Sequence, residues 1–426
     1  MTVITTEENL ISMGIASQVA SRELSRLSDS IKVQALNNIA KALETNQGSI
    51  LEANQLDFQQ AKSQGMDEAM LDRLMLTPER LLATAKEVRN VAQLIDPVGQ
   101  IIETNTLYNG LIMEKRRVPL GVIGSIYESR PNVTVDIASL CIKSGNACLL
   151  RGGKESLYSN TALIDLIQQC IKESGLPIDS VQFVDNPDRH LVTAMLAMKE
   201  YINLLIPRGG SALVNFVGQN ATMPVVTGGI GVCHTYIDSY ADQEKARKIV
   251  FNAKVQRPTV CNALDGIIIH KDIAPAILPS LAQDLCAAGV ELRCDARAMA
   301  MVGPAQHLNV IPANPNDWGT EFLSLVAAVK IVDSLQDALD HIENYGSGHS
   351  EAIITEDTTS GERFLNEVDA AAVYLNASTR FTDGSEFGLG AEVGISTQKF
   401  HARGPMGLAE LTSYKWVIKG SGQIRE

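Results

Sequence analysis

The sequence predicts an α/β protein with parallel sheets, divided into two or three domains. The chain has 426 residues, of which 45% are hydrophobic and 20% charged, and this length is too great for one hydrophobic core. From Arg117 onward, short apolar runs alternate with polar loops and helix-like segments, an order typical of parallel strands joined by right-handed crossovers. A second stretch of the same kind follows the motif VVTGGIGVCHTYID and predicts a further domain.

The two ends of the chain predict different local structures. Residues from Thr6 to about Lys62 are expected to be helical, because apolar residues such as Leu36, Ile39 and Leu43 recur there at helical spacing. The C-terminal segment, LTSYKWVIKGSGQIRE, is amphipathic and strand-like. It fits either an arm that pairs with another subunit or an ordinary edge strand, and the sequence leaves both open.

The composition argues against several classes of partner. A formal net charge of −13 and a pI near 5.1 disfavour nucleic acid and anionic membranes, which both attract basic surfaces. The N-terminus lacks a basic segment followed by an apolar core, and no run approaches the roughly 20 apolar residues of a membrane span. We therefore expect a cytoplasmic protein that binds any anionic ligand through local clusters of basic residues.

The cysteines and histidines predict neither disulfides nor a metal site. The seven cysteines show no CxxC spacing and no disulfide framework, which fits a reducing compartment. The seven histidines form no HExxH motif, and Cys233 and His234 are adjacent, which is poor geometry for two ligands of one ion. No metal is expected.

Two loops combine arginine and glycine directly after strand-like runs. They are LLRGGKES, from Leu149, and IPRGGSALV, from Ile206. Glycine lets the backbone approach a phosphate, the N–H groups at the start of the next helix act as donors, and the basic side chain adds charge. In parallel sheets, ligands bind beyond the carboxyl ends of the strands, where these loops fall. Each loop is an anion-binding candidate, with a plain strand-to-helix turn as the alternative.

Cys261 lies between a basic, proline-containing approach and an apolar run, in FNAKVQRPTVCNALDGIIIH. A free cysteine is most often a small buried hydrophobe, so these residues alone leave core and nucleophile open. Arg257, shortly before it, would favour a thiolate or bind an anionic substrate. Near the C-terminus, STQKFHARGPMGL gathers Lys399, His401 and Arg403 in a constrained loop, for which a solvated charged turn is the alternative.

A series of motifs resembles the γ-glutamyl phosphate reductases, which are part of the aldehyde dehydrogenase superfamily. They occur in the family's order and are RRVPLGVIGSIYESRPNVTVDIASLCIKSGNACLLRGGKES, LLIPRGGSALV, PVVTGGIGVCHTYID, NAKVQRPTVCNALD and SEFGLGAEVGISTQKFHARGPMGL. The resemblance implies an aldehyde dehydrogenase-like α/β fold with a parallel-sheet cofactor domain, an α/β catalytic domain and a small β oligomerisation arm. The implied boundaries are 1–228 for the cofactor-binding domain, with a hairpin arm near 98–117, then 229–405 for the catalytic domain and 406–426 for the C-terminal strand of the arm.

The resemblance also implies an activity: NADPH-dependent reduction of L-glutamyl 5-phosphate to L-glutamate 5-semialdehyde with release of phosphate, in L-proline biosynthesis. Cys261 matches the family's catalytic cysteine, which would carry the glutamyl group as a thioester. Asn132 would stabilise the oxyanion together with the backbone N–H of Cys261, although an ordinary turn asparagine is the alternative. Hydrolytic relatives have a general base where this chain has Thr227, so phosphate rather than water is expected to accept the acyl group.

The same resemblance implies a set of binding residues. Arg151 and Lys154 would neutralise the 2′-phosphate of NADP, and Glu321 would hold the nicotinamide ribose. The implied cofactor-binding residues are Arg151, Gly152, Gly153, Lys154, Pro207, Arg208, Gly209, Gly210, Ser211, Thr227, Gly228 and Glu321. The implied substrate-binding residues are Arg130, Arg257, Lys399, His401 and Arg403.

The resemblance extends to partners and leaves rival functions open. A homo-oligomer is expected, and an association with a glutamate kinase is a further hypothesis. One rival function is that of another acylating aldehyde dehydrogenase, which would use coenzyme A or water as the acyl acceptor. A rival of a different class is a non-catalytic scaffold that kept the fold, for example as a partner of a glutamate kinase.

Overall fold

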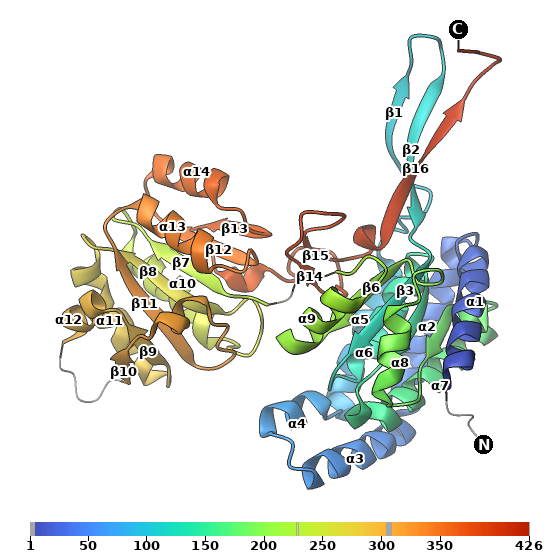
Figure 1. Cartoon of the computed structure of the whole chain (residues 1–426), viewed down its shortest axis with the longest axis horizontal. Helices are drawn as coiled ribbons and strands as arrows, with labels where there is room; N and C mark the ends of the chain where they lie inside the picture. The colour runs from blue at the N-terminus through green and yellow to red at the C-terminus, as the bar shows by residue number, and fades with distance from the viewer. Residues whose placement is uncertain (1–4, 227, 229, 304–308, 426) are drawn as a thin grey trace. The chain divides into compact units, whose positions relative to one another are not determined.

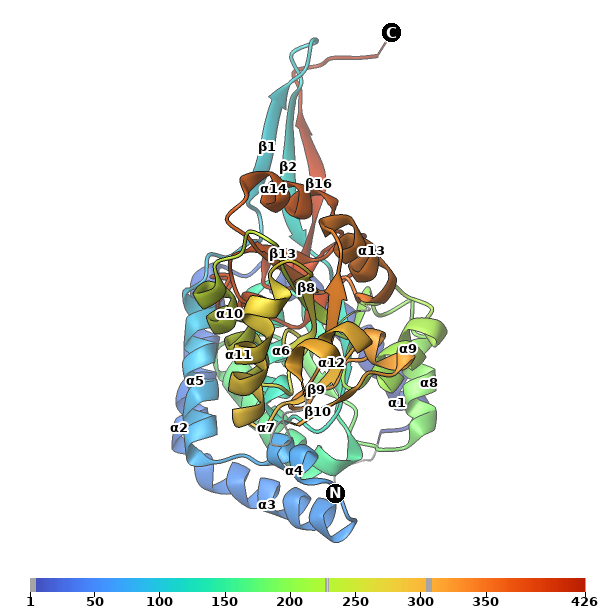
Figure 2. The same cartoon turned by 90° about the vertical axis from the view of Figure 1, so that its left-hand side faces the viewer.

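The computed structural model shows two units and describes residues 5–226, 228, 230–303 and 309–425 (Figures 1 and 2). No helix in these ranges is long and apolar enough to cross a lipid bilayer. Unit 1 comprises Met1–Thr227, Gly388–Gly394 and Met406–Glu426, and unit 2 comprises Gly228–Phe387 and Ile395–Pro405.

The division into units differs from the expected one at Gly228, which belongs to unit 2 and not to the cofactor-binding unit, and at residues 388–394. The expected catalytic domain includes this segment, whereas in the structure it belongs to unit 1. The N–H of Val393 donates to the carbonyl oxygen of Met406, and the N–H of Met406 donates to that of Gly394. These backbone hydrogen bonds tie the segment to the start of the C-terminal region, 406–426, which also belongs to unit 1.

Unit 1 begins with helices, as the spacing of apolar residues predicts. The first helix starts after Thr6, whose hydroxyl oxygen accepts the N–H of Asn9 while the Asn9 side chain accepts the N–H of Thr6. The fifth starts after Thr77, which caps it, and has Pro78 in its first turn. The helices described in unit 1 are α1 (Glu7–Leu24), α2 (Asp29–Thr45), α3 (Gln47–Ser63), α4 (Glu68–Leu74), α5 (Pro78–Gln93), α6 (Asn132–Lys143), α7 (Leu157–Glu173), α8 (Arg189–Leu196) and α9 (Ser211–Asn220).

The central sheet of unit 1 is parallel and covered on both faces. One face packs on α1, α8 and α9 through a cluster that includes Ala147 and Leu149. Cys148 lies between these two residues, so its side chain points to the other face of the sheet, where its thiol contacts Cys141 of α6. Strands buried on both sides explain the continuous apolar runs in the sequence. The strand order is β5 (Val181–Phe183), β4 (Ala147–Arg151), β3 (Val122–Tyr127) and β6 (Leu204–Arg208).

A three-stranded antiparallel sheet projects from the rest of unit 1 (Figures 1 and 2). A hairpin forms two of its strands, and the C-terminal strand pairs with the second from Thr412 opposite Pro119 to Lys419 opposite Ile112. All residues of the first strand are exposed, and so are Tyr414 and Trp416 of the last. The strands are β1 (Ile101–Thr106), β2 (Ile112–Pro119) and β16 (Thr412–Lys419).

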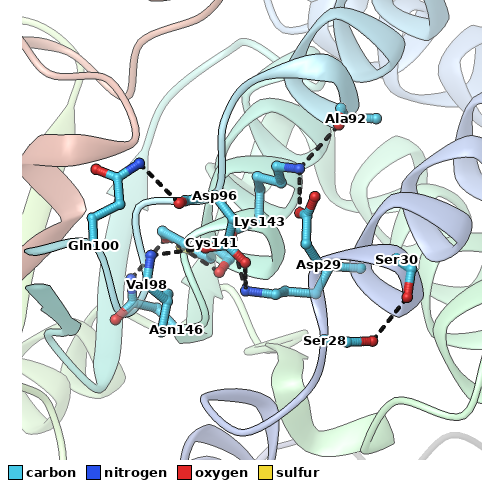
Figure 3. Close-up of polar contacts among 12 residues, drawn as sticks. Ser28, Asp29, Ser30, Ala92, Asp96, Val98, Gln100, Cys141, Lys143 and Asn146 are labelled. Atoms are coloured by element: carbon cyan, nitrogen blue, oxygen red, sulfur yellow. Dashed lines mark hydrogen bonds and ion pairs between the residues drawn. The ribbon is translucent and has the colours of Figure 1, made fainter.

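Buried lysines connect the root of this sheet to the helices of unit 1 (Figure 3). The side chain of Lys143 donates to Asp29 Oδ1 at 2.5 Å and to the carbonyl oxygen of Ala92 at 3.0 Å. Lys32 forms an ion pair with Asp96, in the segment that leads from α5 to β1. Since both lysines are 0% exposed, each depends on its carboxylate partner to offset the cost of burying the charge.

Unit 2 contains a second parallel sheet with helices on both faces. Alternate residues of a strand face opposite layers: Ile267 and Ile269 pack with the helices between residues 243 and 302, whereas Ile268 packs with the helices between residues 335 and 367. The strand order is β10 (Val310–Pro312), β9 (Glu291–Cys294), β11 (Val326–Val332), β8 (Leu264–His270), β7 (Cys233–Ile237), β12 (Ser350–Ile354) and β13 (Ala372–Leu375). The helices are α10 (Gln243–Val255), α11 (Ala274–Ala287), α12 (Ala296–Val302), α13 (Leu335–Tyr345) and α14 (Thr358–Glu367). A small antiparallel pair, β14 (Ile395–Ser396) and β15 (Gly404–Pro405), belongs to the same unit.

Candidate active site

The two arginine–glycine loops lie at one edge of the unit 1 sheet. Arg151 ends β4 opposite Ile126, and Arg208 ends β6 opposite Tyr127, so the loops flank the carboxyl end of β3. Successive strands run to one side of β3 as far as β5, and β6 lies on its other side. The loops therefore meet where the strand order reverses, which is the position at which open parallel sheets bind their ligands.

Two features make this edge a candidate binding site for an anionic group. The N–H of Gly210, at the start of α9, donates to Glu128 Oε2 at 3.1 Å, and this carboxylate oxygen occupies the kind of position that a phosphate oxygen would take. Arg151 Nη2 donates to the carbonyl oxygen of Pro187, whereas its buried Nε has no hydrogen-bond partner among the described residues. Backbone donors and an incompletely paired guanidinium suit a phosphate of a nicotinamide dinucleotide.

Lys154 does not contact the arginine–glycine edge through any hydrogen bond among the described residues, and it faces a cavity. It is exposed and lines this cavity, of about 210 Å³ between α3 and the start of α7, together with Gln60, Gln64 and Tyr158. Pro187, whose carbonyl oxygen accepts a hydrogen bond from Arg151, also lines this cavity. Thr227 lies outside the described residues, and its neighbour Gly228 belongs to unit 2.

Asn132 starts α6, directly after the loop that follows β3. Its side-chain N–H donates to Asp136 Oδ2 at 3.0 Å, and burial raises the pKa of Asp136 to about 7. The preceding loop contains Arg130, which is half-buried, and Ser129, whose φ is 46°. Asn132 thus has a fixed side-chain orientation at the same sheet edge as the two glycine loops.

Cys261 lies in unit 2, in the tight loop between α10 and β8. It is half-buried, and its carbonyl oxygen accepts the thiol of Cys233 at 3.2 Å. A Cβ atom at Gly231 would lie 1.5 Å from that same carbonyl oxygen, so only glycine fits there. The N–H of Gly231 donates to Glu321 Oε1 at 2.9 Å, which places Glu321 one contact away from the Cys261 backbone.

The residue after Cys261 fixes the other side of the loop. Asn262 is buried, and its side chain donates to the carbonyl oxygens of Thr382 at 2.9 Å and Arg380 at 3.3 Å. Its own carbonyl oxygen accepts the hydroxyl of Thr379 at 2.8 Å. Cys261 is therefore held between the 231–233 segment and the 379–382 segment, which constrains the position of its side chain.

Arg380 is the residue near Cys261 that sequence reasoning missed. Its Nε donates to Gln256 Oε1 at 3.0 Å, next to Arg257. Burial lowers the pKa of Arg380 and the charge of Arg257 lowers it further, whereas Asp383 and Cys261 raise it. Arg380 therefore interacts with the charges of both Arg257 and Cys261. An isolated arginine more than a hundred residues along the chain from Cys261 carries no signal that could have revealed this.

In the predicted basic loop near the C-terminus, Lys399 and Arg403 both contact Asp369. Arg403 donates from Nη1 to Asp369 Oδ1 at 2.6 Å and from Nη2 to the Asp369 carbonyl oxygen at 3.0 Å. Lys399 forms an ion pair with the same carboxylate, and both cations lower the pKa of Asp369. His401 lies between them with a φ of 62°. A substrate anion would have to compete with Asp369 for these two cations.

A buried ion pair underlies the start of β8. Lys254, 0% exposed, donates from Nζ to the carbonyl oxygen of Leu264 at 2.8 Å and to Asp265 Oδ1 at 3.3 Å. Burial lowers the pKa of Lys254 and raises the pKa of Asp265 to about 7. The N–H of Phe322, next to Glu321, also donates to Asp265. The pair joins the end of α10, the start of β8 and the Glu321 segment around the Cys261 loop.

The adjacent Cys233 and His234 make separate contacts. Cys233 contacts the Cys261 loop, whereas His234 Nδ1 lies 3.1 Å from Glu351 Oε2. Within the described part of the chain, no three His, Cys, Asp or Glu side chains form a group that could hold a metal ion.

Comparison with known proteins identifies the family. A model described as "Aldehyde dehydrogenase family" matches residues 4–312. A protein of Dehalococcoides mccartyi (strain CBDB1) named "Gamma-glutamyl phosphate reductase" is 59% identical over 408 residues, which are 96% of each chain. A protein of the same name from Salmonella dublin is 54% identical over 97% of this chain and 99% of its own. The crystal structure of gamma-glutamyl phosphate reductase from Thermotoga maritima has a TM-score of 0.95 and 45% identity, covering 98% of this chain and 100% of that one.

The fold and the matched region define an oxidoreductase of the aldehyde dehydrogenase class, whose members use a nicotinamide cofactor. Within that class, the chain belongs to the gamma-glutamyl phosphate reductase family, because relatives of that name match nearly its whole length at more than half identity. The predicted family, enzyme class and α/β fold are therefore confirmed. An acetylating aldehyde dehydrogenase from Geobacillus thermoglucosidasius, 16% identical with a TM-score of 0.70, has the same fold over 99% of this chain and 98% of its own.

Proposed function

We propose that this chain reduces L-glutamyl 5-phosphate to L-glutamate 5-semialdehyde with NADPH, in proline biosynthesis, through a thioester on Cys261. The observation that carries this proposal is the Cys261 loop. A half-buried cysteine is held on both sides by buried contacts, between segments that carry Arg257 and Arg380, in a chain whose relatives bear the reductase name. Neighbouring cations favour the thiolate form of a cysteine, which is the nucleophilic form.

The chain's own residues account for the acyl-transfer chemistry. The Cys261 thiolate attacks the acyl phosphate carbonyl, the C–S bond forms, and the C–O bond to phosphate breaks as phosphate leaves. The bound nicotinamide cofactor supplies a hydride. After the thioester carbon is reduced, the oxyanion collapses, the C–S bond breaks, and the aldehyde departs while Cys261 regains its thiolate. The Cys261 N–H and the Asn132 amide are the proposed donors to the oxyanion.

The cofactor would bind in unit 1 at the edge where the glycine loops meet. Gly152, Gly153, Gly209 and Gly210 would let the backbone approach phosphate oxygens, and α9 would supply N–H donors at its start. Glu321 would hold the nicotinamide ribose, in exchange for its contact with Gly231. The remaining proposed contacts come from Pro207, Arg208, Ser211, Thr227 and Gly228.

Replacing Arg151 by alanine is expected to weaken NADP binding selectively. A half-buried guanidinium that binds the 2′-phosphate would contribute about 1–3 kcal/mol, whereas exposed Lys154 would contribute less than about 1 kcal/mol. NAD has no 2′-phosphate, so its dissociation constant should change little. Titration of both cofactors by fluorescence or calorimetry measures the difference, with exposed Lys172→Ala as the control. Equal weakening of NADP and NAD would contradict the assignment.

The oxidative reaction tests the proposed function directly. With glutamate semialdehyde and NADP but no phosphate, we expect one burst of NADPH formation and then arrest, because the thioester has no acceptor. Adding phosphate should restore steady turnover, and coenzyme A should not replace it. The expectation rests on Thr227, which provides no carboxylate base for water. Sustained turnover to glutamate without phosphate would instead indicate a hydrolytic dehydrogenase.

Location and assembly are parts of the same proposal. All seven cysteines are unpaired, which fits a reducing, cytoplasmic setting. The exposed β1–β2–β16 sheet would serve as the arm of a homo-oligomer, because it presents Tyr414, Trp416 and Ile418 on an open antiparallel sheet. An association with a glutamate kinase would shorten the path of a reactive acyl phosphate to Cys261.

A further inference from the structure

Arg257 and Arg380 come from distant parts of the chain, and both belong to segments that border Cys261. Arg257 lies in the loop before Cys261, and Arg380 lies in a short 3₁₀ helix, Thr379–Phe381. The Arg380 side chain donates to Gln256, and its carbonyl oxygen accepts the side chain of Asn262. Arg380 thus contacts the residues on both sides of the 257–261 stretch.

We propose that Arg257 and Arg380 together form the subsite that binds the phosphoryl group of the acyl phosphate and, in reverse, inorganic phosphate. The inference rests on the proposed function and adds to it a residue and a division of roles among the cations. Paired guanidiniums are well suited to a tetrahedral dianion, since each presents several N–H donors in a plane.

The chemistry of the substrate favours phosphate over carboxylate at this position. The phosphoryl oxygen is bonded to the carbon that Cys261 attacks, so the phosphate must lie next to the thiolate. The α-carboxylate stands at the other end of the glutamyl chain and must be recognised farther away. Arg257, in the Cys261 loop, and Arg380, which contacts both sides of that loop, are therefore placed for the phosphate.

The charge balance supports the same conclusion. Burial disfavours the charged form of Arg380, and the charge of Arg257 adds to this cost, whereas Asp383, Cys261 and Glu386 offset part of it. Two cations held close together gain stabilisation from an anion bound between them. Lys399 and Arg403 are in a different situation, because Asp369 already supplies them with a carboxylate.

Steady-state kinetics of the Arg380→Gln variant in the oxidative direction tests the proposal. The KM for phosphate is expected to rise about 10- to 100-fold, the effect of losing a charged hydrogen-bond donor. The KM for glutamate semialdehyde should stay within about twofold, and the phosphate-free burst should keep its amplitude, because thioester formation does not involve phosphate. Arg380→Lys should show a smaller rise, and Arg363→Gln, which removes an ion pair with Glu367 on α14, should match the wild type.

A measurement without turnover separates this proposal from the proposed function. Inorganic phosphate should slow alkylation of Cys261 by iodoacetamide in the wild type, and this protection should be lost in Arg380→Gln. Protection in a wild-type protein that fails to turn over would overturn the reductase assignment and support the subsite. An unchanged KM for phosphate, or protection that persists in Arg380→Gln and Arg380→Lys, would overturn the subsite.

Discussion

Replacing Cys261 by serine is expected to reduce turnover by at least about a thousandfold while leaving NADP binding nearly unchanged. A serine hydroxyl is a far weaker nucleophile than a thiolate and has no general base assigned beside it. The fold should survive, because the contacts that Cys233 and Gly231 make in this loop involve the Cys261 carbonyl oxygen. NADPH oxidation with the acyl phosphate measures the effect, and cofactor titration with thermal denaturation checks folding.

Cys286 provides the matched control for this experiment. It is half-buried like Cys261, whereas the other five cysteines are buried. Cys286 lies on α11, and burial raises its pKa, which lowers the fraction of reactive thiolate. Cys286→Ser should keep full activity, and iodoacetamide should label Cys261 first in the wild type, with protection by substrate. Activity of Cys261→Ser close to that of Cys286→Ser would rule out a thioester on Cys261.

The sequence predicts the fold well because its signals are local. Apolar runs such as GIIIH become strands buried on both faces, and the alternation of Ile267, Ile268 and Ile269 between two helix layers explains why no polar residue interrupts them. The arm is harder to predict, because its first strand is fully exposed and carries no hydrophobic pattern. Residues 388–394 join unit 1 through backbone hydrogen bonds, which side-chain patterns do not reveal.

The candidate site is only partly predictable from the sequence. The glycine loops lie at the carboxyl edge of the unit 1 sheet, as parallel topology requires. Cys261 lies instead before the amino end of β8, a position that this topological rule does not indicate. The contacts of Arg380 with Gln256, and of Lys399 with Asp369, join residues far apart in sequence, so only the folded chain shows which cations share a site.

Replacing Lys254 by methionine is expected to reduce the free energy of unfolding of unit 2 by about 3–5 kcal/mol, because it leaves the Asp265 carboxylate buried without its cation. Trp318 lies in unit 2 and Trp416 in unit 1, so urea unfolding followed by fluorescence in a Trp416→Phe background reports on unit 2. The matched control is Lys245→Met on the same helix, where an exposed pair with Glu356 should contribute less than about 1 kcal/mol. Equal losses in the two variants would contradict the predicted role of burial.

The pKa of Asp265 determines how the stability loss of the Lys254→Met variant depends on pH. Its folded pKa of about 7 is higher than the unfolded value near 3.9, so its contribution to stability is fully present below about pH 4 and is lost as pH rises through 7. Without Lys254 the folded pKa should rise further, since that lysine lowers it. The Lys254→Met loss should therefore be largest above pH 7 and shrink as the solution becomes acidic. The double variant Lys254→Met/Asp265→Asn carries neither charge and should recover most of the stability at pH 8. If the double variant is as unstable as Lys254→Met, the lysine acts through packing and through its hydrogen bond to Leu264, and not through its charge.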